Sequence, residues 1–139
     1  MNAPVYTTEI LRLAATLREP VTLERIDGRA ELRSPTCGST IVTSVMLGDD
    51  SRVAAISQTV SACAFGQASA ALLERGAVNA SAGEAQRAFD QLSDWLGGRR
   101  DDPGDWPGLV ALGPARRKAG RHGAILLPFR ALLAAMRAD

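Results

Sequence analysis

A β-hairpin in the first half of the chain is the sequence feature that most restricts the fold. Residues 40–47 are rich in β-branched side chains and alternate as a strand does, and residues 53–60 form a matching run. Between them, residues 48–51 read Gly-Asp-Asp-Ser, which is a strong turn signal. The side chains expected on one face of the first run are Ile41, Thr43, Val45 and Leu47.

A third, shorter strand precedes this hairpin. Residues 30–33 alternate between apolar and charged side chains, with Gly28 before them and Pro35 after them. Three consecutive strands with short connections predict an antiparallel meander. A sheet of this kind is expected to be covered on one face only.

Helical periodicity dominates both ends of the chain. Apolar residues recur three and four positions apart over residues 6–17, Thr7 or Thr8 can cap the start, and Pro20 ends the pattern. Residues 67–74 are dominated by alanine and leucine, which predicts a second helix that ends at Gly76. The three predicted strands therefore lie between two helical segments in the sequence.

Two further helices are expected in the second half. Ser81 and Glu84 form a capping box that opens a helix ending at residues 97–98, and residues 99–107 then form a polar surface loop. A last helix is expected over residues 124–137, with Pro128 tolerated only in its first turn. The residues expected to be buried in these two helices are Ala85, Ala88, Phe89, Leu92, Trp95 and Leu96, then Ile125, Phe129, Leu132, Leu133 and Met136. Strands followed by helices predict an α+β fold.

Composition and charge narrow the functional class. The 139 residues are expected to form a single domain, residues 1–139, and 16 basic residues nearly balance 15 acidic ones. This balance argues against a general nucleic-acid-binding surface. One local basic cluster, residues 116–118 with Arg121, is either a solvated loop or a docking patch for a protein or an anion. No signal peptide or membrane-spanning run is recognised, so a soluble, cytoplasmic protein is expected.

Two cysteines are the main candidates for chemistry. Cys37 lies in the expected link between the first two strands, where Pro35 and Gly38 shape the turn. Cys63 lies where the third strand gives way to a helix, whose free N–H groups favour a thiolate. In a reducing compartment a metal-binding or catalytic role gains weight over a disulfide. Inert packing of either thiol is the alternative, because free cysteine is often buried.

His122, the only histidine, precedes the last helix, so all three soft metal ligands fall at the ends of expected elements. A solvated histidine beside Arg121 is the plain alternative. The spacing matches no zinc-finger pattern, and the chain has no dinucleotide-binding glycine motif, P-loop, nucleophile elbow or carboxylate cluster. On residue chemistry alone, a metal site is only a hypothesis.

Three motifs in order resemble the IscU/NifU-type family of iron–sulfur cluster assembly scaffolds. The family's Pro-x-Cys-Gly-Asp corresponds to residues 35–39, Pro-Thr-Cys-Gly-Ser. Its second cysteine, followed by small residues and an Ala-Ser pair, corresponds to residues 63–73, and its His-Cys-x-x-Leu corresponds to residues 122–126, His-Gly-Ala-Ile-Leu. The resemblance covers nearly the whole chain, including an N-terminal helix with a tyrosine. It implies the IscU/NifU (SufE-like) scaffold fold.

The chain is a divergent member by this resemblance. The aspartate two residues after the first cysteine is Ser39, and the third cysteine is Gly123. The ligand set implied is Cys37, Cys63 and His122, with Ser39 close by. Because a [2Fe–2S] cluster commonly has four protein ligands, the fourth place is left to water, Ser39, a small thiol or another subunit. A single Zn²⁺ also accepts two cysteines and a histidine with one position open.

The function implied by the resemblance is that of a carrier and not an enzyme. It would receive sulfur from a cysteine desulfurase, hold iron or a nascent [2Fe–2S] cluster, and pass it to acceptor apo-proteins. Two alternatives stay open. One is a degenerate module that binds zinc or a desulfurase without building clusters, and the other is a sulfurtransferase that uses Cys63 alone.

Overall fold

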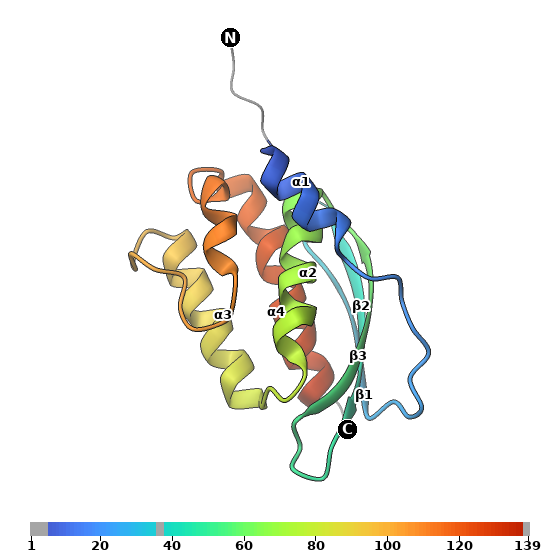
Figure 1. Cartoon of the computed structure of the whole chain (residues 1–139). Coiled ribbons are helices and arrows are strands. Elements are labelled where there is room, and N and C mark those ends of the chain that lie inside the picture. Colours follow the sequence, from blue (N-terminus) through green and yellow to red (C-terminus); the bar gives the residue numbers. More distant parts are fainter. Residues whose placement is uncertain (1–5, 36–37, 138–139) are drawn as a thin grey trace.

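The computed structural model describes residues 6–35 and 38–137. A three-stranded sheet lies against a layer of helices (Figure 1). The elements in chain order are α1 (Thr8–Ala15), β1 (Gly28–Arg33), β2 (Thr40–Leu47), β3 (Val53–Ser61), α2 (Ala64–Ala77), α3 (Ala82–Leu96), the 3₁₀ helices η1 (Leu109–Ala115) and η2 (Ala119–Arg121), and α4 (His122–Arg137).

The sheet is the antiparallel meander that the sequence predicts, in the order β1-β2-β3. Gly28 of β1 pairs with Val45 of β2, and Thr40 of β2 pairs with Ser61 of β3. A register shift between Met46 and Leu47 marks the end of regular pairing beside the turn. The predicted strand bounds are confirmed for β2 and are short by two residues at the start of β1.

One face of the sheet is buried by α2 and α4. Ile41, Thr43 and Val45 alternate toward this face and are almost fully buried, as predicted. The segment between α1 and β1 runs along the other side of the sheet (Figure 1). There the backbone N–H of Val21 donates a hydrogen bond to the Ser57 hydroxyl of β3. The helices thus cover a single face.

Helix α1 is shorter than the predicted span of residues 6–17. Thr7 is its N-cap, as predicted, and its hydroxyl accepts a hydrogen bond from the Ile10 N–H. At the other end the backbone N–H of Thr16 bonds back to the carbonyls of Leu13 and Ala14, and its hydroxyl also bonds to Leu13. This closing turn ends the helix before Pro20, because the last carbonyls are already satisfied.

Helix α2 extends beyond both predicted ends, and the prediction that Gly76 terminates it is wrong. Gly76 lies inside the helix, which continues to Ala77 before Val78 turns extended. A Cβ at Gly76 would lie 2.6 Å from the indole of Trp106. The glycine therefore serves close packing between segments and not helix termination.

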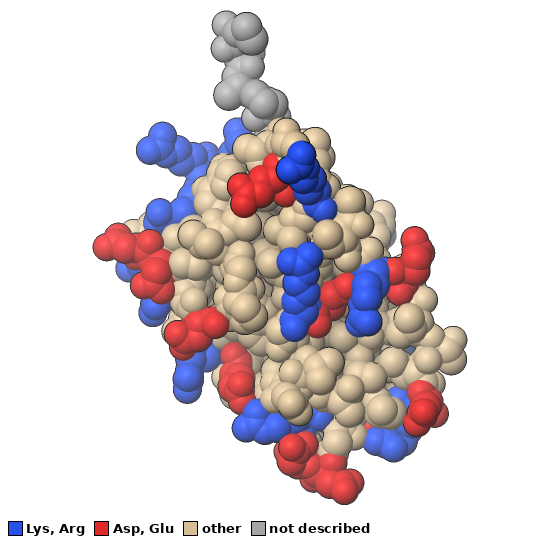
Figure 2. Space-filling view, viewed as in Figure 1, with Lys and Arg blue, Asp and Glu red and all other residues tan. Residues whose placement is uncertain are grey.

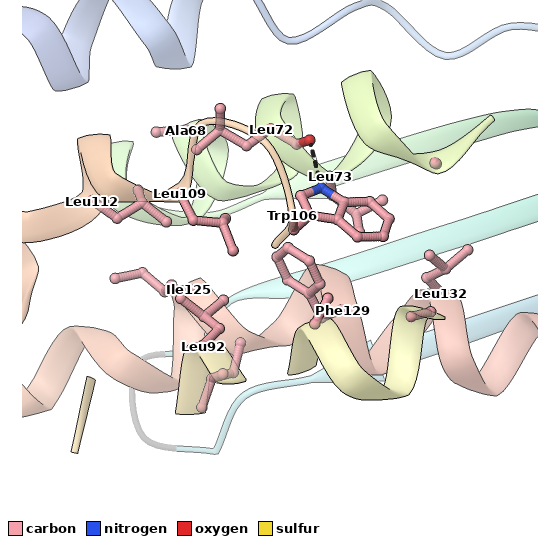
Figure 3. Packing of buried hydrophobic residues seen from close by; sticks show 14 of the residues in the cluster. Ala68, Leu72, Leu73, Leu92, Trp106, Leu109, Leu112, Ile125, Phe129 and Leu132 are labelled. Atoms are coloured by element: carbon pink, nitrogen blue, oxygen red, sulfur yellow. Dashed lines mark hydrogen bonds between the residues drawn. The ribbon is translucent and has the colours of Figure 1, made fainter. Parts of the chain in front are cut away.

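Helix α3 begins and ends where the sequence predicts. The Ser81 hydroxyl accepts from the Glu84 N–H and bonds to the Glu84 carboxylate, and Gly97 caps the other end. The loop that follows is not only a surface excursion, because Trp106 is buried with 7% exposure. Its indole N–H donates to the Leu72 carbonyl at 3.0 Å (Figure 3). The loop thus contributes a core residue that the sequence analysis missed.

Helix α4 starts two residues earlier than predicted, at His122, so Pro128 lies beyond the first turn. Pro128 has no N–H to give the Ala124 carbonyl, which lies instead against α2 at Gly66. The predicted inner face is buried except for Met136, which is half-buried. In α3, Phe89 is also only half-buried, and the Arg130 guanidinium lies 5.6 Å from its ring centroid.

The core lies between α2, α3, α4 and the inner face of the sheet. Trp106 and Phe129 meet edge to face at its centre, with ring centroids 5.4 Å apart (Figure 3). Many core positions of α2 and α4 are alanines, which let helix axes approach closely. Within residues 6–35 and 38–137, none of the helices is long and apolar enough to cross a membrane.

Candidate functional site

Cys63 occupies the N-cap position of α2. Its backbone is extended, with φ −66° and ψ 172°, and its side chain makes no capping hydrogen bond. The thiol is free and half-buried. It therefore lies beside the N–H groups of the helix start, and it can be reached from outside.

Cys37 lies outside the described residues, but the turn around it is partly defined. The Gly38 N–H donates to the Ser34 carbonyl at 3.0 Å, and the Ser34 N–H donates to the Ser39 carbonyl at 2.8 Å. Gly38 has φ +72°, a conformation that favours glycine, in agreement with the predicted unusual turn. Ser34 and Ser39, on either side of this turn, are each buried with 4% exposure.

His122 is the first residue of α4, and its ring is half-buried. Its Nε2 lies 2.9 Å from the Ala115 carbonyl oxygen and 3.2 Å from that of Arg116. Because a carbonyl only accepts, Nε2 carries the proton. With Nε2 engaged in this way, Nδ1 is the ring nitrogen left for a metal ion, and the two carbonyls orient the ring.

The starts of α2 and α4 lie side by side. A Cβ at Gly66, three residues after Cys63, would lie 3.3 Å from the Cβ of Ala124, two residues after His122. Cys63 and His122 are therefore at the same end of two packed helices. Within residues 6–35 and 38–137, no group of three or more histidine, cysteine or carboxylate side chains could hold a metal ion. Of the three predicted ligands, Cys63 and His122 lie in the described part of the chain.

Tyr6 joins this end of the molecule, although the sequence analysis gave it no site role. Its hydroxyl donates a hydrogen bond to the Cys63 sulfur, and its ring centroid lies 5.1 Å from that of Phe65. Burial raises the pKa of Tyr6, and the neighbouring Cys63 raises it further through its charge and its hydrogen bond, while Arg121 lowers it. A lone tyrosine just before a helix cap carries no spacing signal that could have linked it to Cys63.

The basic cluster divides into residues with different roles. Arg116 is structural, since its guanidinium donates to the carbonyls of Trp95 and Arg100 and lies 5.1 Å from the Trp95 ring centroid. Arg121 instead lies 5.8 Å from the Tyr6 ring centroid, beside the candidate site. Arg117 is exposed. On the face seen in Figure 2, acidic and basic side chains are interspersed, and they form no large patch of like charge.

The end of the helical layer where α2 and α4 begin carries these groups. It offers a thiol at a helix start, an imidazole with an oriented ring, a phenol that hydrogen-bonds to the thiol, and a guanidinium. Such a set can bind a soft metal ion or present a nucleophilic sulfur.

The chain resembles solved structures, but it matches no protein-family profile, and no curated protein matches it significantly. Among solved structures, it is similar to the N-terminal part of a nitrogen-fixing NifU-like protein from Brucella abortus. That match has 29% identity and a TM-score of 0.87, and it covers 96% of this chain and 92% of the other.

Two further structures share the fold. One is described as a putative iron–sulfur cluster assembly scaffold protein for the SUF system from Fervidobacterium islandicum AW-1, with 16% identity, a TM-score of 0.84, and coverage of 96% and 97%. The other is a hypothetical protein with 23% identity, a TM-score of 0.67, and coverage of 93% and 96%. The predicted α+β fold with a three-stranded antiparallel sheet is confirmed.

Proposed function

We propose, from the premise that this chain is an IscU/NifU-like protein, that it serves as an iron–sulfur cluster assembly scaffold. It is a carrier and not an enzyme with turnover. The observation that carries the proposal is the placement of Cys63 and His122 at the starts of two packed helices, in a fold shared with scaffold proteins. The likeness to the NifU-like protein from Brucella abortus supports it further.

The cargo is iron or a nascent [2Fe–2S] cluster held by Cys37, Cys63 and His122. The free thiol of Cys63 and the lone pair on Nδ1 of His122 fit such a cargo, because both are soft donors. Ser39, close to Cys37 in sequence, belongs to the surroundings and not to the three main ligands. Gly123 stands where the family has a third thiolate, so one coordination place is left to a non-protein ligand or another subunit.

Sulfur arrives from a cysteine desulfurase. The thiolate of Cys63 or of Cys37 attacks the terminal sulfur of the persulfide on that enzyme and forms a new S–S bond. The S–S bond of the donor breaks, and the donor cysteine leaves as a thiolate, so no external oxidant or reductant is needed. The acceptors of the finished cargo are apo-proteins.

Anaerobic reconstitution tests the proposal. The purified protein is incubated with ferrous iron and sulfide, or with a desulfurase and cysteine, and iron and sulfide are counted beside the visible charge-transfer absorption. We expect bound iron and sulfide in the wild type and their loss in Cys37→Ala and Cys63→Ala. Thr59→Ala, an exposed change on β3, is the control. Absence of absorption, with no effect of either cysteine change, would falsify the proposal.

A second candidate follows from the missing third cysteine. A module with two cysteines and one histidine can hold Zn²⁺ with an open position and bind a desulfurase without assembling clusters. Elemental analysis separates the two functions. Stoichiometric zinc without iron uptake favours this module, and iron with sulfide favours the scaffold.

A sulfurtransferase that uses Cys63 alone is the third candidate. It predicts that Cys37→Ala leaves transfer of persulfide sulfur intact while Cys63→Ala abolishes it. A scaffold needs both residues for the cargo. Mass spectrometry of the persulfide on each single variant distinguishes these results.

A further inference from the structure

A hollow in the surface lies at the end of α2 that is far from Cys63. It has a volume of about 260 Å³ and is bounded by the end of α2, one face of α3 and the loop at residues 105–107. Cys63 caps the start of α2 and Gly76 lies near its end. At about 1.5 Å of rise per residue, the two sites are about 20 Å apart along the helix. This hollow is therefore distinct from the cysteine site.

The wall formed by the loop is rigidly built. Trp106 lies against Gly76, where a Cβ would come within 2.6 Å of the indole, and its N–H is bonded to the Leu72 carbonyl. On the other side, Gly104 lies so close to α3 that a Cβ would come within 2.2 Å of Gln91. The Asp105 N–H also donates to the Gln91 side-chain oxygen at 3.1 Å. The loop that bounds the hollow is thus held against both α2 and α3.

Small side chains keep the hollow open. Ala80 and Ala88 line it and are each only 3% exposed, so a larger apolar residue at either position would project into the space. The indole of Trp106 supplies an aromatic surface in the same lining. The apolar part of the wall therefore suits a small aliphatic or aromatic group.

Charged side chains of both signs line the hollow. Glu84, Arg87 and Gln91 follow one another at helical spacing on the face of α3, and Asp105 adjoins Gln91. Glu84 is already engaged by Arg52 and Ser81. The side chains of Arg87 and Asp105 make no hydrogen bond or ion pair with residues 6–35 or 38–137. One cation and one anion in the lining are thus free to bind a ligand.

We propose that this hollow binds a small zwitterion of the α-amino acid class. The ligand's carboxylate pairs with Arg87, its ammonium group pairs with Asp105, and its apolar side chain lies on the Trp106 indole. A simple anion would face the Asp105 carboxylate, and a simple cation would face Arg87. Pockets for drug-sized ligands measure roughly 300–1,000 Å³, so a hollow of about 260 Å³ suits a small ligand such as an amino acid.

Protein-observed NMR titration of the full chain tests the proposal. The probes are leucine, leucine amide without the carboxylate, N-acetyl-leucine without the ammonium group, and glycine without the apolar side chain. Leucine should produce saturable shifts at the Trp106 indole and at the backbone amides of Ala80 and Ala88. Each of the other three should bind about tenfold more weakly or worse, which corresponds to about 1.4 kcal/mol.

Variants assign the binding to the proposed groups. Arg87→Ala and Asp105→Asn are exposed changes that should each weaken leucine binding about tenfold. Arg29→Ala, an exposed change on β1, should leave it unchanged. The absence of saturable shifts with leucine overturns the proposal. So does equal binding of the four probes, or leucine binding that survives both Arg87→Ala and Asp105→Asn. None of these results bears on cluster reconstitution, which tests the other end of α2.

Discussion

At the scale of single residues, Cys63, Tyr6 and Arg121 form one electrostatic group. The phenol of Tyr6 donates to the Cys63 sulfur, and the Arg121 guanidinium lies over the Tyr6 ring. Burial disfavours the charged phenolate, and a phenolate beside the Cys63 sulfur would lose its hydrogen bond and be repelled by a negative charge there. Tyr6 should therefore stay protonated to a higher pH than an ordinary tyrosine.

The titration of Tyr6 is directly measurable, because the chain contains one tyrosine. We expect the phenolate absorbance to appear with a midpoint above the ordinary value of 10.0, as the raised pKa of Tyr6 requires. The Cys63→Ala variant should lower that midpoint, since it removes a neighbouring charge and a hydrogen bond. Arg121→Ala should raise it, because Arg121 lowers the pKa of Tyr6.

The raised pKa of Tyr6 also predicts how the free energy of unfolding changes with pH. A group whose pKa is raised by folding stabilises the folded state fully below its unfolded pKa, and this stabilisation is lost as pH rises through the folded value. The unfolded chain in denaturant, monitored by the same absorbance, is the reference. An unchanged midpoint in the Cys63→Ala variant, with circular dichroism showing a folded protein, would contradict the proposed contact.

At the scale of elements, the most informative contact is between α2 and the loop that carries Trp106. The indole occupies the place where a side chain on Gly76 would lie, and it bonds to the Leu72 carbonyl one turn earlier. The loop is thus fitted to one helix surface. Alanine substitutions at two helical glycines, Gly76 and Gly83, separate this packing effect from intrinsic helix propensity.

Gly76→Ala should destabilise the protein, although alanine is the better helix former by about 1 kcal/mol. The new Cβ would lie 2.6 Å from the indole, and overpacking of this kind costs about 1–3 kcal/mol. Gly83→Ala in α3 is the matched control, because the nearest atom to its Cβ is 3.9 Å away. Urea unfolding should give a lower free energy for the first variant and an equal or higher one for the second.

Trp106→Phe tests the hydrogen bond at the same contact. Phenylalanine keeps an aromatic ring in the core but leaves the buried Leu72 carbonyl without its indole donor. Because the Leu72 carbonyl keeps its backbone bond within α2, we expect a loss of about 0.5–1.5 kcal/mol in the free energy of unfolding, the contribution of one hydrogen bond. A loss below a few tenths of a kcal/mol would mean that the bond contributes little.

At the scale of the whole molecule, paired arginine and carboxylate side chains bond to segments that are distant in sequence. Asp27 binds Arg25 and also accepts from the Leu47 N–H, which fastens the segment before β1 to the end of β2. Glu84 of α3 pairs with Arg52 at the start of β3. Side-chain bonds from Arg25 and Arg52 lower the pKa of Asp27 and of Glu84, respectively.

Acid should therefore weaken the fold in a defined window. The ordinary values are 3.8 for Asp27 and 4.5 for Glu84, and both folded values lie lower. A lowered pKa means that the stabilisation is present above the ordinary value and is lost as pH falls through the folded one. Urea midpoints should fall on acidification through this range, and Asp27→Asn should reduce the slope. Asp101→Asn, which removes an exposed carboxylate, should leave the slope unchanged.

Local sequence chemistry accounts for most of the elements. The hairpin of β2 and β3, the Thr7 cap and the Ser81–Glu84 capping box were all predicted, because each depends on residues a few positions apart. The predictions for Gly76 and Pro128 were wrong for one reason. Each residue was judged by its effect on an isolated helix, whereas packing between α2, α4 and the loop decides what it does.

The amino-acid sequence by itself determined the order of the strands and helices, the face of the sheet that is buried, and the cysteine and histidine at element ends. These features arise from alternation, capping and turn chemistry within short windows. Tertiary structure alone decided that Trp106 enters the core and that Tyr6 contacts Cys63. It also decided that Arg87 and Asp105 line one hollow. Such contacts join distant segments, and only the packing of α1, α2, α3 and the connecting loop brings their side chains together.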